Sequence, residues 1–279
     1  MRSQVVPRKL ILRSLAHIGI GAITILWVLP ILWMLMSAFR DPGEPFYTGI
    51  LPSHFTLVNF RKVLSNPIAV RSFRNSFVVA ASAAAVDLVI ASLAAYGFSR
   101  FRFPGHKGLQ VMLLVVRLFP GVLLAITLFQ VAGFLNVYDT HIPLILANAL
   151  LNLPFATWNL RTTFEMLPIE LEEAAWLDGA TRIGGIRRIL LPLMAPGLAA
   201  TGAFVFLLSW NEYLFAVSFI RSPEKQLITA TIAANIGQYN IDFTALIATA
   251  MLASLPLLAV FLLIQRYIVS GLGVGAIRG

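Results

Sequence analysis

Long apolar runs that carry almost no charge dominate this chain and limit what it can fold into. The first run, 15–39, contains no Asp, Glu, Lys or Arg. A helix that crosses the hydrocarbon core of a membrane needs about 20 mostly apolar residues, and this run is long enough. A soluble chain with 58% hydrophobic and 12% charged residues would lack the polar surface to cover its core. The sequence therefore indicates a membrane protein.

Six such runs follow one another, and they predict an all-α polytopic membrane bundle of six transmembrane helices. The expected spans are 15–39, 76–99, 108–131, 141–160, 195–220 and 243–264. The first run is too long for the apolar core of a signal peptide, which has about 7–15 residues, so we expect it to be a retained anchor. Residues 1–14 are expected to form a cytoplasmic N-terminal segment and residues 15–279 one transmembrane domain.

Lys and Arg are concentrated in alternate connections between the runs, which predicts a multi-pass protein of the cytoplasmic (inner) membrane with both termini in the cytoplasm. The segment 40–75, expected outside, weakens this bias because it is also basic. The net charge of +9 follows from these connections, and no basic patch with interleaved aromatic residues indicates nucleic-acid binding. The chain has no cysteine, which excludes disulfides and thiolate metal sites.

Other classes of membrane protein fit less well. The four histidines are scattered and no H-E-x-x-H motif occurs, so no catalytic or metal-binding residues are predicted. A secondary transporter would be longer and would show repeated halves, which this sequence lacks. No G-x-x-x-x-G-K-[ST] loop is present, so the chain is not expected to hold ATP.

The connection 165–197 differs in composition from the rest of the chain. It begins with acidic residues and continues with Arg182, Arg187 and Arg188. Pro168 and the acids predict a helix start, Asp178-Gly179 predicts its end, and Thr181 predicts the cap of a second short helix that Pro192 ends. We call this segment the elbow. An interfacial helix on the membrane surface is the alternative, but anionic headgroups would repel an acidic helix, so a protein partner fits better.

The elbow is similar to the EAA loop of ABC importer permeases. The resemblance rests on Glu173-Ala174-Ala175, Gly179, Ile189 and Leu191-Pro192, which match the loop at every spacing. It implies that the elbow is a coupling helix that docks on an ATPase. In that case Glu173 would make a polar contact to the ATPase, Gly179 would permit a tight turn, and Ile189, Leu191 and Pro192 would anchor the loop on the bundle. Ala174 and Ala175 would leave a shallow face, and Asp178 would help to end the first helix.

Several other stretches resemble the shorter, six-span permease of maltose-type sugar importers. They are Pro30-Ile31-Leu32-Trp33, Asn75-Ser76, Ala95 to Gly105, Phe119-Pro120, Trp210-Asn211-Glu212-Tyr213 and the tail from Gly271-Leu272 to Arg278-Gly279. The resemblance implies transport of an oligosaccharide or related carbohydrate, and the alternative is another solute such as a polyamine or phosphate ester. It also implies a second, different permease, two ATPase subunits that bind ATP and Mg, and an extracytoplasmic solute-binding protein. No cofactor is expected in this chain.

Polar and charged residues inside the expected spans are candidates for function. The stretch Trp210, Asn211, Glu212 and Tyr213, together with Asn152, offers the aromatic, amide and carboxylate groups that bind sugar hydroxyls, so these residues are candidates for the substrate pathway. Hydrogen bonds between helices are the alternative role. Asp87 and Arg117 lie at similar expected depths, and we predict an intramembrane ion pair in which each charge makes the other tolerable.

Overall fold

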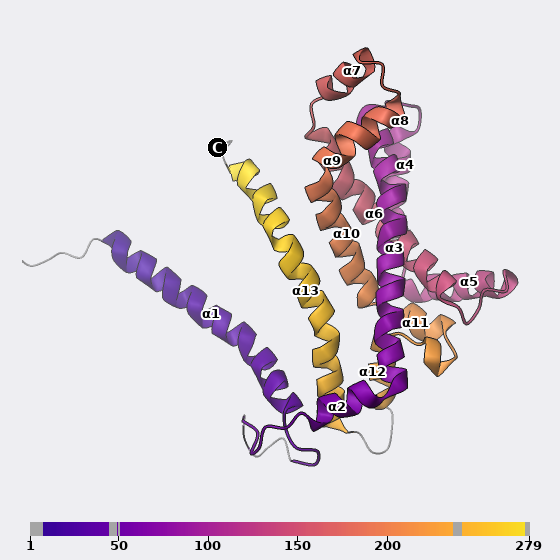
Figure 1. The fold of residues 1–279 in the computed structure, drawn as a ribbon. Helices are drawn as coiled ribbons and strands as arrows, with labels where there is room; N and C mark the ends of the chain where they lie inside the picture. The colour runs from indigo at the N-terminus through magenta and orange to yellow at the C-terminus, as the bar shows by residue number, and fades with distance from the viewer. Residues whose placement is uncertain (1–7, 45–48, 50, 237–241, 277–279) are drawn as a thin grey trace, which may run out of the picture. The chain divides into compact units, whose positions relative to one another are not determined.

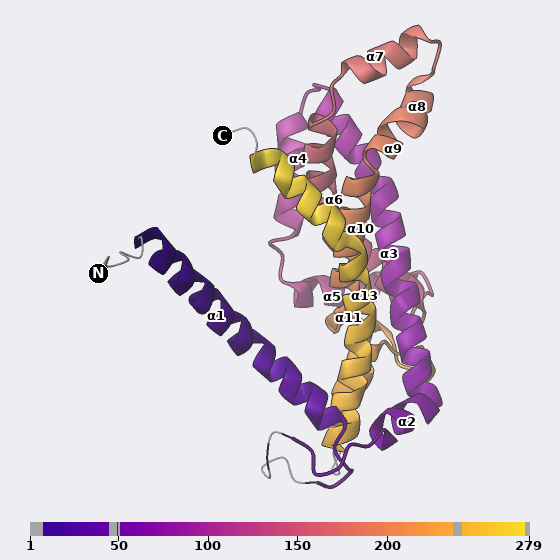
Figure 2. The ribbon, with the colours of Figure 1, turned by 60° about the vertical axis from the view of Figure 1, so that its left-hand side comes forward.

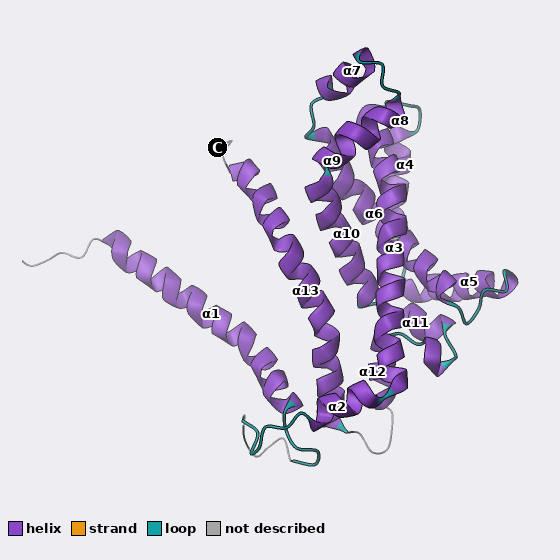
Figure 3. Cartoon of the chain, in the orientation of Figure 1, coloured by secondary structure: helices purple, strands orange, loops and turns teal. Residues whose placement is uncertain are grey.

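A computed structural model describes residues 8–44, 49, 51–236 and 242–276, and within these ranges the chain contains helices and loops but no strand (Figure 3). The first seven residues and Arg278-Gly279 of the tail lie outside the described residues. The main helices are α1 (Arg8–Ala38), α2 (Val58–Ser65), α3 (Pro67–Arg100), α4 (His106–Val116), α5 (Gly121–Phe134), α6 (His141–Glu165), α7 (Glu170–Leu177), α8 (Arg182–Gly185), α9 (Leu191–Leu193), α10 (Ala195–Trp210), α11 (Leu214–Phe219), α12 (Ile228–Ile236) and α13 (Phe243–Ala276). A π-helical turn, Ile186–Leu190, joins α8 to α9, and a 3-10 turn, Pro223–Lys225, precedes α12.

The chain divides into two compact units, and each is described by itself. The smaller unit takes in Met1–Asn66 and Gly237–Leu252, and so holds α1, α2 and the first residues of α13. A buried amide organises it, since Asn59 Nδ2 donates to the carbonyls of Ala38 and Arg40 while Asn59 Oδ1 accepts from Thr244. These bonds join the end of α1 to α2 and to the start of α13.

The larger unit is built on α3, α6 and α10, which run side by side in both ribbon views (Figures 1 and 2). Their contact is close because α3 presents small residues to its neighbours. The buried members of this core include Ala80, Ala84, Ala91 and Ala95 of α3, Ala156 and Leu160 of α6, and Val205 of α10. Gly202 of α10 packs so closely on α3 that an added Cβ would lie 2.8 Å from Leu88 Cδ1.

Three described helical segments are long and apolar enough to cross a membrane, namely Arg13–Ala38, Pro67–Arg100 and Phe243–Gln265. The number rises to five if each of two bent helix pairs counts as one span. The structure thus supports an all-helical polytopic bundle with three to five candidate spans. The helix α6 is long, but Asn148, Asn152 and Asn159 lower its hydropathy, and it is not among the five.

Two of the predicted spans are not continuous helices. The expected span 108–131 divides into α4 and α5, which are bent by 96° at the break. The physical reason is Pro120, because a residue that precedes proline avoids the helical conformation and Phe119 therefore ends the run. The expected span 195–220 divides into α10 and α11, with Asn211 to Tyr213 between them. The structure therefore breaks the helix at two of the six predicted spans.

Candidate functional site

The first helix of the elbow ends as its sequence predicts. Gly179 has φ +83°, a conformation that glycine adopts without the steric cost of a side chain. The Ala180 N–H donates to the Ala175 carbonyl at 2.9 Å, and the Gly179 N–H donates to the Trp176 carbonyl at 3.0 Å. These two bonds form a Schellman motif, which satisfies the last carbonyls of α7. The turn after Asp178 is therefore set by local chemistry.

The second part of the elbow begins at its predicted cap but does not end where expected. The Thr181 hydroxyl accepts a hydrogen bond from the Gly184 N–H at 3.1 Å, which confirms the cap. The helical run then continues past Pro192 to Leu193 and meets α10 at a bend of 78°. Proline does not end this run because it occupies the first turn of α9, where a missing N–H costs nothing.

Two neighbouring acids of α7 have different surroundings. The Glu173 side chain is exposed, whereas only 3% of Glu172 is exposed. Glu172 Oε1 accepts from Arg100 Nε at 2.5 Å, and its Oε2 accepts from the Tyr96 hydroxyl at 2.9 Å. The helix α7 therefore presents one carboxylate to α3 and the next one to its surroundings.

Sequence reasoning missed Glu172 as the acid that attaches the elbow to the bundle. The signal was present, since a Glu-Glu pair on one helix must place its members about 100° apart. What the sequence lacked was the register of α7 against α3. Ala175 is buried beside Gly185 of α8 and marks the inner face of α7. The bonds of Glu172 to Tyr96 and Arg100 set the register of α7 against α3. Ala174, predicted to share a shallow face with Ala175, is exposed instead.

The residues that anchor the second part of the elbow differ from those predicted. Leu190 and Met194 are fully buried in the main core of the unit. Ile189 and Leu191 are only half-buried and Pro192 is exposed, so this trio is not the main anchor within this chain. The π-helical turn at 186–190 shifts the side-chain phase, which spacing in a regular α-helix does not anticipate.

The candidate pathway residues lie at the break between α10 and α11 or near it. Trp210 is buried and stacks on Phe206, with ring centroids 5.7 Å apart. Glu212 accepts from the N–H groups of Phe215 and Ala216 at 2.8 and 3.1 Å, so its carboxylate caps the start of α11. These contacts give both residues a structural role.

The remaining pathway candidates divide between a helix contact and the surface. The Asn152 amide of α6 donates to the Ser209 hydroxyl of α10 at 3.3 Å, so it serves helix packing. Asn211 and Tyr213 are exposed. Of the five candidates, these two are exposed, Glu212 is half-buried, and Trp210 and Asn152 are buried.

The predicted ion pair between Asp87 and Arg117 is wrong in this structure. Asp87 is fully buried in α3, and neither of its carboxylate oxygens has a hydrogen-bond partner among the described residues. Arg117 is exposed at the α4–α5 break, with its guanidinium 5.9 Å from the centroid of the Phe155 ring. Expected depth alone could not reveal the break that carries Arg117 away from α3.

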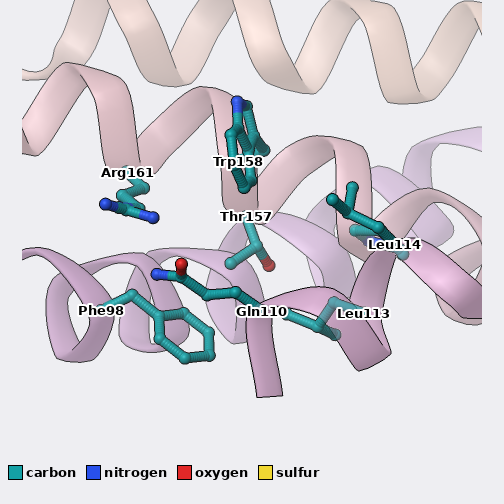
Figure 4. Close-up of a pocket in the computed structure, with 8 residues that line it drawn as sticks. Phe98, Gln110, Leu113, Leu114, Thr157, Trp158 and Arg161 are labelled. Atoms are coloured by element: carbon teal, nitrogen blue, oxygen red, sulfur yellow. The ribbon is translucent and has the colours of Figure 1, made fainter. Parts of the chain in front are cut away.

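A small enclosed space lies between α3, α4 and α6, as Figure 4 shows. Its volume is about 10 Å³, which is comparable to one water molecule and far below a sugar. Most of its lining is apolar, although Gln110, Thr157 and Arg161 contribute polar groups. This space is not a solute site. Among the described residues, no group of three or more His, Cys, Asp or Glu could hold a metal ion.

Outside the elbow, the connection between α5 and α6 carries a well-bonded acid, Asp139. Its carboxylate accepts from the hydroxyl and N–H of Ser222, the N–H of Arg221, and Lys225 Nζ, at 2.6 to 3.0 Å. These bonds, led by that of the Ser222 hydroxyl, hold the pKa of Asp139 below its usual range. They join this connection to the segment that follows α11.

Comparison with known proteins shows which family this chain belongs to. The family model described as "binding-protein-dependent transport system inner membrane component" matches residues 87–274, more than half of the chain. The chain belongs to this family. It is therefore an inner-membrane multi-pass permease of a binding-protein-dependent ABC importer, a transport subunit that works with a binding protein and an ATPase.

Relatives and solved structures agree with this assignment. The permease is 32% identical to the inner membrane ABC transporter permease protein YcjP of Escherichia coli, over 94% of this chain and 95% of that one. It is 33% identical to the trehalose/maltose transport system permease protein MalG of Thermococcus litoralis, over the full length of both. Its fold resembles a chain in the crystal structure of a bacterial ABC transporter for alginate import, with a TM-score of 0.79 at 19% identity over 95% of this chain and 99% of that one.

Proposed function

We propose that this permease docks on its ATPase through the elbow and forms part of a translocation pathway for an oligosaccharide or related carbohydrate. The observation that carries the docking proposal is the exposed face of α7. Glu173 lies on it with no partner among the described residues, and Leu177 at its end is 89% exposed. An exposed leucine and a carboxylate with no partner within the described chain leave this face available to another protein.

The proposed topology has six spans with both termini in the cytoplasm. The bent pair α4 and α5 would then count as one span, α10 with α11 as another, and α6 would be the sixth. The elbow and the connection between α3 and α4 would both face the cytoplasm, which agrees with the basic residues in them. Residues 1–14 would be a cytoplasmic segment, and residues 15–279 the permease domain. A second, different permease and two ATPase subunits would complete the membrane complex.

The carbohydrate assignment is supported by the relative named for trehalose and maltose transport. Asn211 and Tyr213 are exposed at the α10–α11 break, and amide and phenol groups suit sugar hydroxyls. We propose these two residues as solute contacts of this chain. The other candidates would support the pathway by packing rather than by contact.

Affinity purification from the native membrane in mild detergent, with mass spectrometry of the bound proteins, tests the docking proposal. The chain should bring down a second permease and an ATPase, and Glu173→Lys should lose the ATPase because it reverses the charge of the exposed face. Glu224→Lys, which reverses an exposed acid in the 3-10 turn outside the elbow, is the matched control. Equal recovery of the ATPase with all three chains would reject the elbow as its docking site. Uptake of labelled maltose, trehalose and a polyamine by the same cells would separate the solute classes.

A further inference from the structure

Glu172 ties the elbow to the longest helix of the larger unit. Only 3% of Glu172 is exposed, and both of its carboxylate oxygens accept hydrogen bonds from α3. Arg100, the last residue of α3, also donates from Nη2 to the Leu167 carbonyl at 3.0 Å. One arginine therefore holds both α7 and the segment that leads into it.

Aromatic contacts strengthen the same junction from the second part of the elbow. The Arg182 guanidinium lies 5.3 Å from the ring centroid of Phe101, which follows α3, and 5.1 Å from that of Trp176 in α7. Cation–π contacts of this kind attract an arginine to an aromatic face. The end of α3 is thus joined to both parts of the elbow by side chains.

A short connection, 166–169, joins α7 to α6, whereas the covalent path from α7 forward to α10 is less direct. It passes through the turn at Gly179, the π-helical turn Ile186–Leu190 and a bend of 78° before it reaches α10. Helical segments bend most easily at turns, π-helical segments and existing bends. By contrast, α3 is an unbroken helix of 34 residues, about 51 Å long at 1.5 Å per residue. Figure 2 shows α7 beyond the end of α3 that carries these contacts.

We propose that Glu172, Tyr96 and Arg100 form a latch that makes α7 and α3 move as one body, so that displacement of the elbow reaches the bundle through α3. This proposal rests on the docking role proposed above for the outer face of α7. Glu173 would receive the displacement from the ATPase and Glu172, its neighbour, would pass it to α3. Glu172 is a positioning residue in this scheme, since it touches neither solute nor nucleotide.

Spin labels can test the latch because the chain has no native cysteine. Glu170→Cys places a label on α7 and Leu93→Cys places one on the exposed face of α3. The measurement is the distribution of label distances in the full complex in nanodiscs, without nucleotide and with ATP under conditions that block hydrolysis. We expect one narrow distribution that ATP leaves unchanged. With Glu172→Gln added, the narrow peak should be lost, because a neutral amide removes the ion pair with Arg100 and leaves only a weaker hydrogen bond.

Three further variants make the test decisive. Tyr96→Phe removes one hydrogen bond and keeps the charge pair, so an intermediate broadening is expected even if Glu172→Gln does not fold. Glu165→Gln breaks an exposed pair with Arg161 and should leave the distribution as it was. Glu173→Lys separates the two proposals, because it should release the ATPase and still keep the narrow peak.

If Glu172 only stabilised the fold, its substitution would not change how α3 responds to ATP. The response of α3 to ATP therefore decides between the two roles. Glu172→Gln should keep the ATPase bound and reduce the ATP-driven population shift of α3 by roughly 10-fold, within the range known for coupling residues. This shift is read from a second label pair, which joins Leu93→Cys of α3 to a label on the partner permease. A narrow peak that survives Glu172→Gln would overturn the latch. So would a distance that changes with ATP in the unsubstituted complex, because α7 and α3 would then move separately.

Discussion

Two buried carboxylates of the larger unit, Glu172 and Asp87, have opposite surroundings. Glu172 lies at the end of the bundle and accepts from Arg100 and Tyr96 with both oxygens. Asp87 lies within α3 and neither of its oxygens has a partner among the described residues. Equal burial therefore does not mean equal function. A bonded carboxylate holds two elements together, whereas an unbonded one costs free energy where it lies.

The difference follows from where each residue lies in the sequence. Near a helix end, arginine side chains and unpaired backbone groups are within reach, and Glu172 meets Arg100 at the end of α3. In the middle of α3, the residues on the same face as Asp87 are small, and Ala83, Ala84 and Ala91 are all buried. Alanine side chains offer no hydrogen-bond donor. An acid in such a place depends on a neighbouring helix for a partner, and none is seen here among the described residues.

The same substitution at both sites should give the largest contrast. Glu172→Ala should destabilise the permease by about 3–5 kcal/mol, because it leaves the nearly buried Arg100 charge unpaired. The measurement is thermal unfolding of the purified protein in detergent. The control is Glu165→Ala, which breaks an exposed pair and should cost at most about 0.5 kcal/mol. Equal losses in the two variants would mean that the buried pair contributes no more than a surface one.

Asp87→Ala should have a much smaller effect and an opposite sign. It removes a buried polar group with no partner, so the permease should be unchanged or stabilised by about 1 kcal/mol. The same unfolding assay checks this, with Ala91→Ser on the same face as the control that adds a buried hydroxyl. A large loss of stability in Asp87→Ala would show that the carboxylate has a partner in the assembled protein.

A double-mutant cycle with Arg117 sharpens this result. Because Arg117 is exposed at the α4–α5 break, Asp87→Ala and Arg117→Gln should add within about 0.5 kcal/mol. If the second substitution instead recovers stability lost through the first, the two side chains interact, and the ion pair predicted from the sequence would be supported.

The smallest effect is expected at Asp139, which is fully bonded but not buried in the bundle. Its pKa is lowered in the folded state, so its contribution to stability is complete above the unfolded pKa of about 3.9 and is lost as pH falls through the folded value. Asp139→Asn should therefore lower the stability modestly at pH 7, where the contribution is complete, and flatten the fall in stability below about pH 4. Thermal unfolding from pH 7 to pH 3 measures this. If stability depends on pH in the same way in both proteins, the bonds of Asp139 do not contribute to stability.

Much of the elbow could be predicted because its signals are local. Gly179 takes a left-handed conformation, and Thr181 bonds an N–H three residues on, so both depend on near neighbours in sequence. Packing across the elbow was less predictable. The burial of Glu172 and Leu190 depends on how α7 meets α3 and on the π-helical turn, and spacing along one helix contains neither.

The sequence by itself determined the class of this protein. Apolar length and charge placement indicated a polytopic helical membrane protein, and the elbow spacing indicated an ABC importer permease, because solvation and local capping act on short stretches of chain. Only the tertiary structure decided which acid binds α3, which one stays exposed, and that Asp87 and Arg117 are not partners. Those outcomes depend on distances between helices, and a break such as that at Pro120 changes such distances without changing the hydropathy that predicted the span.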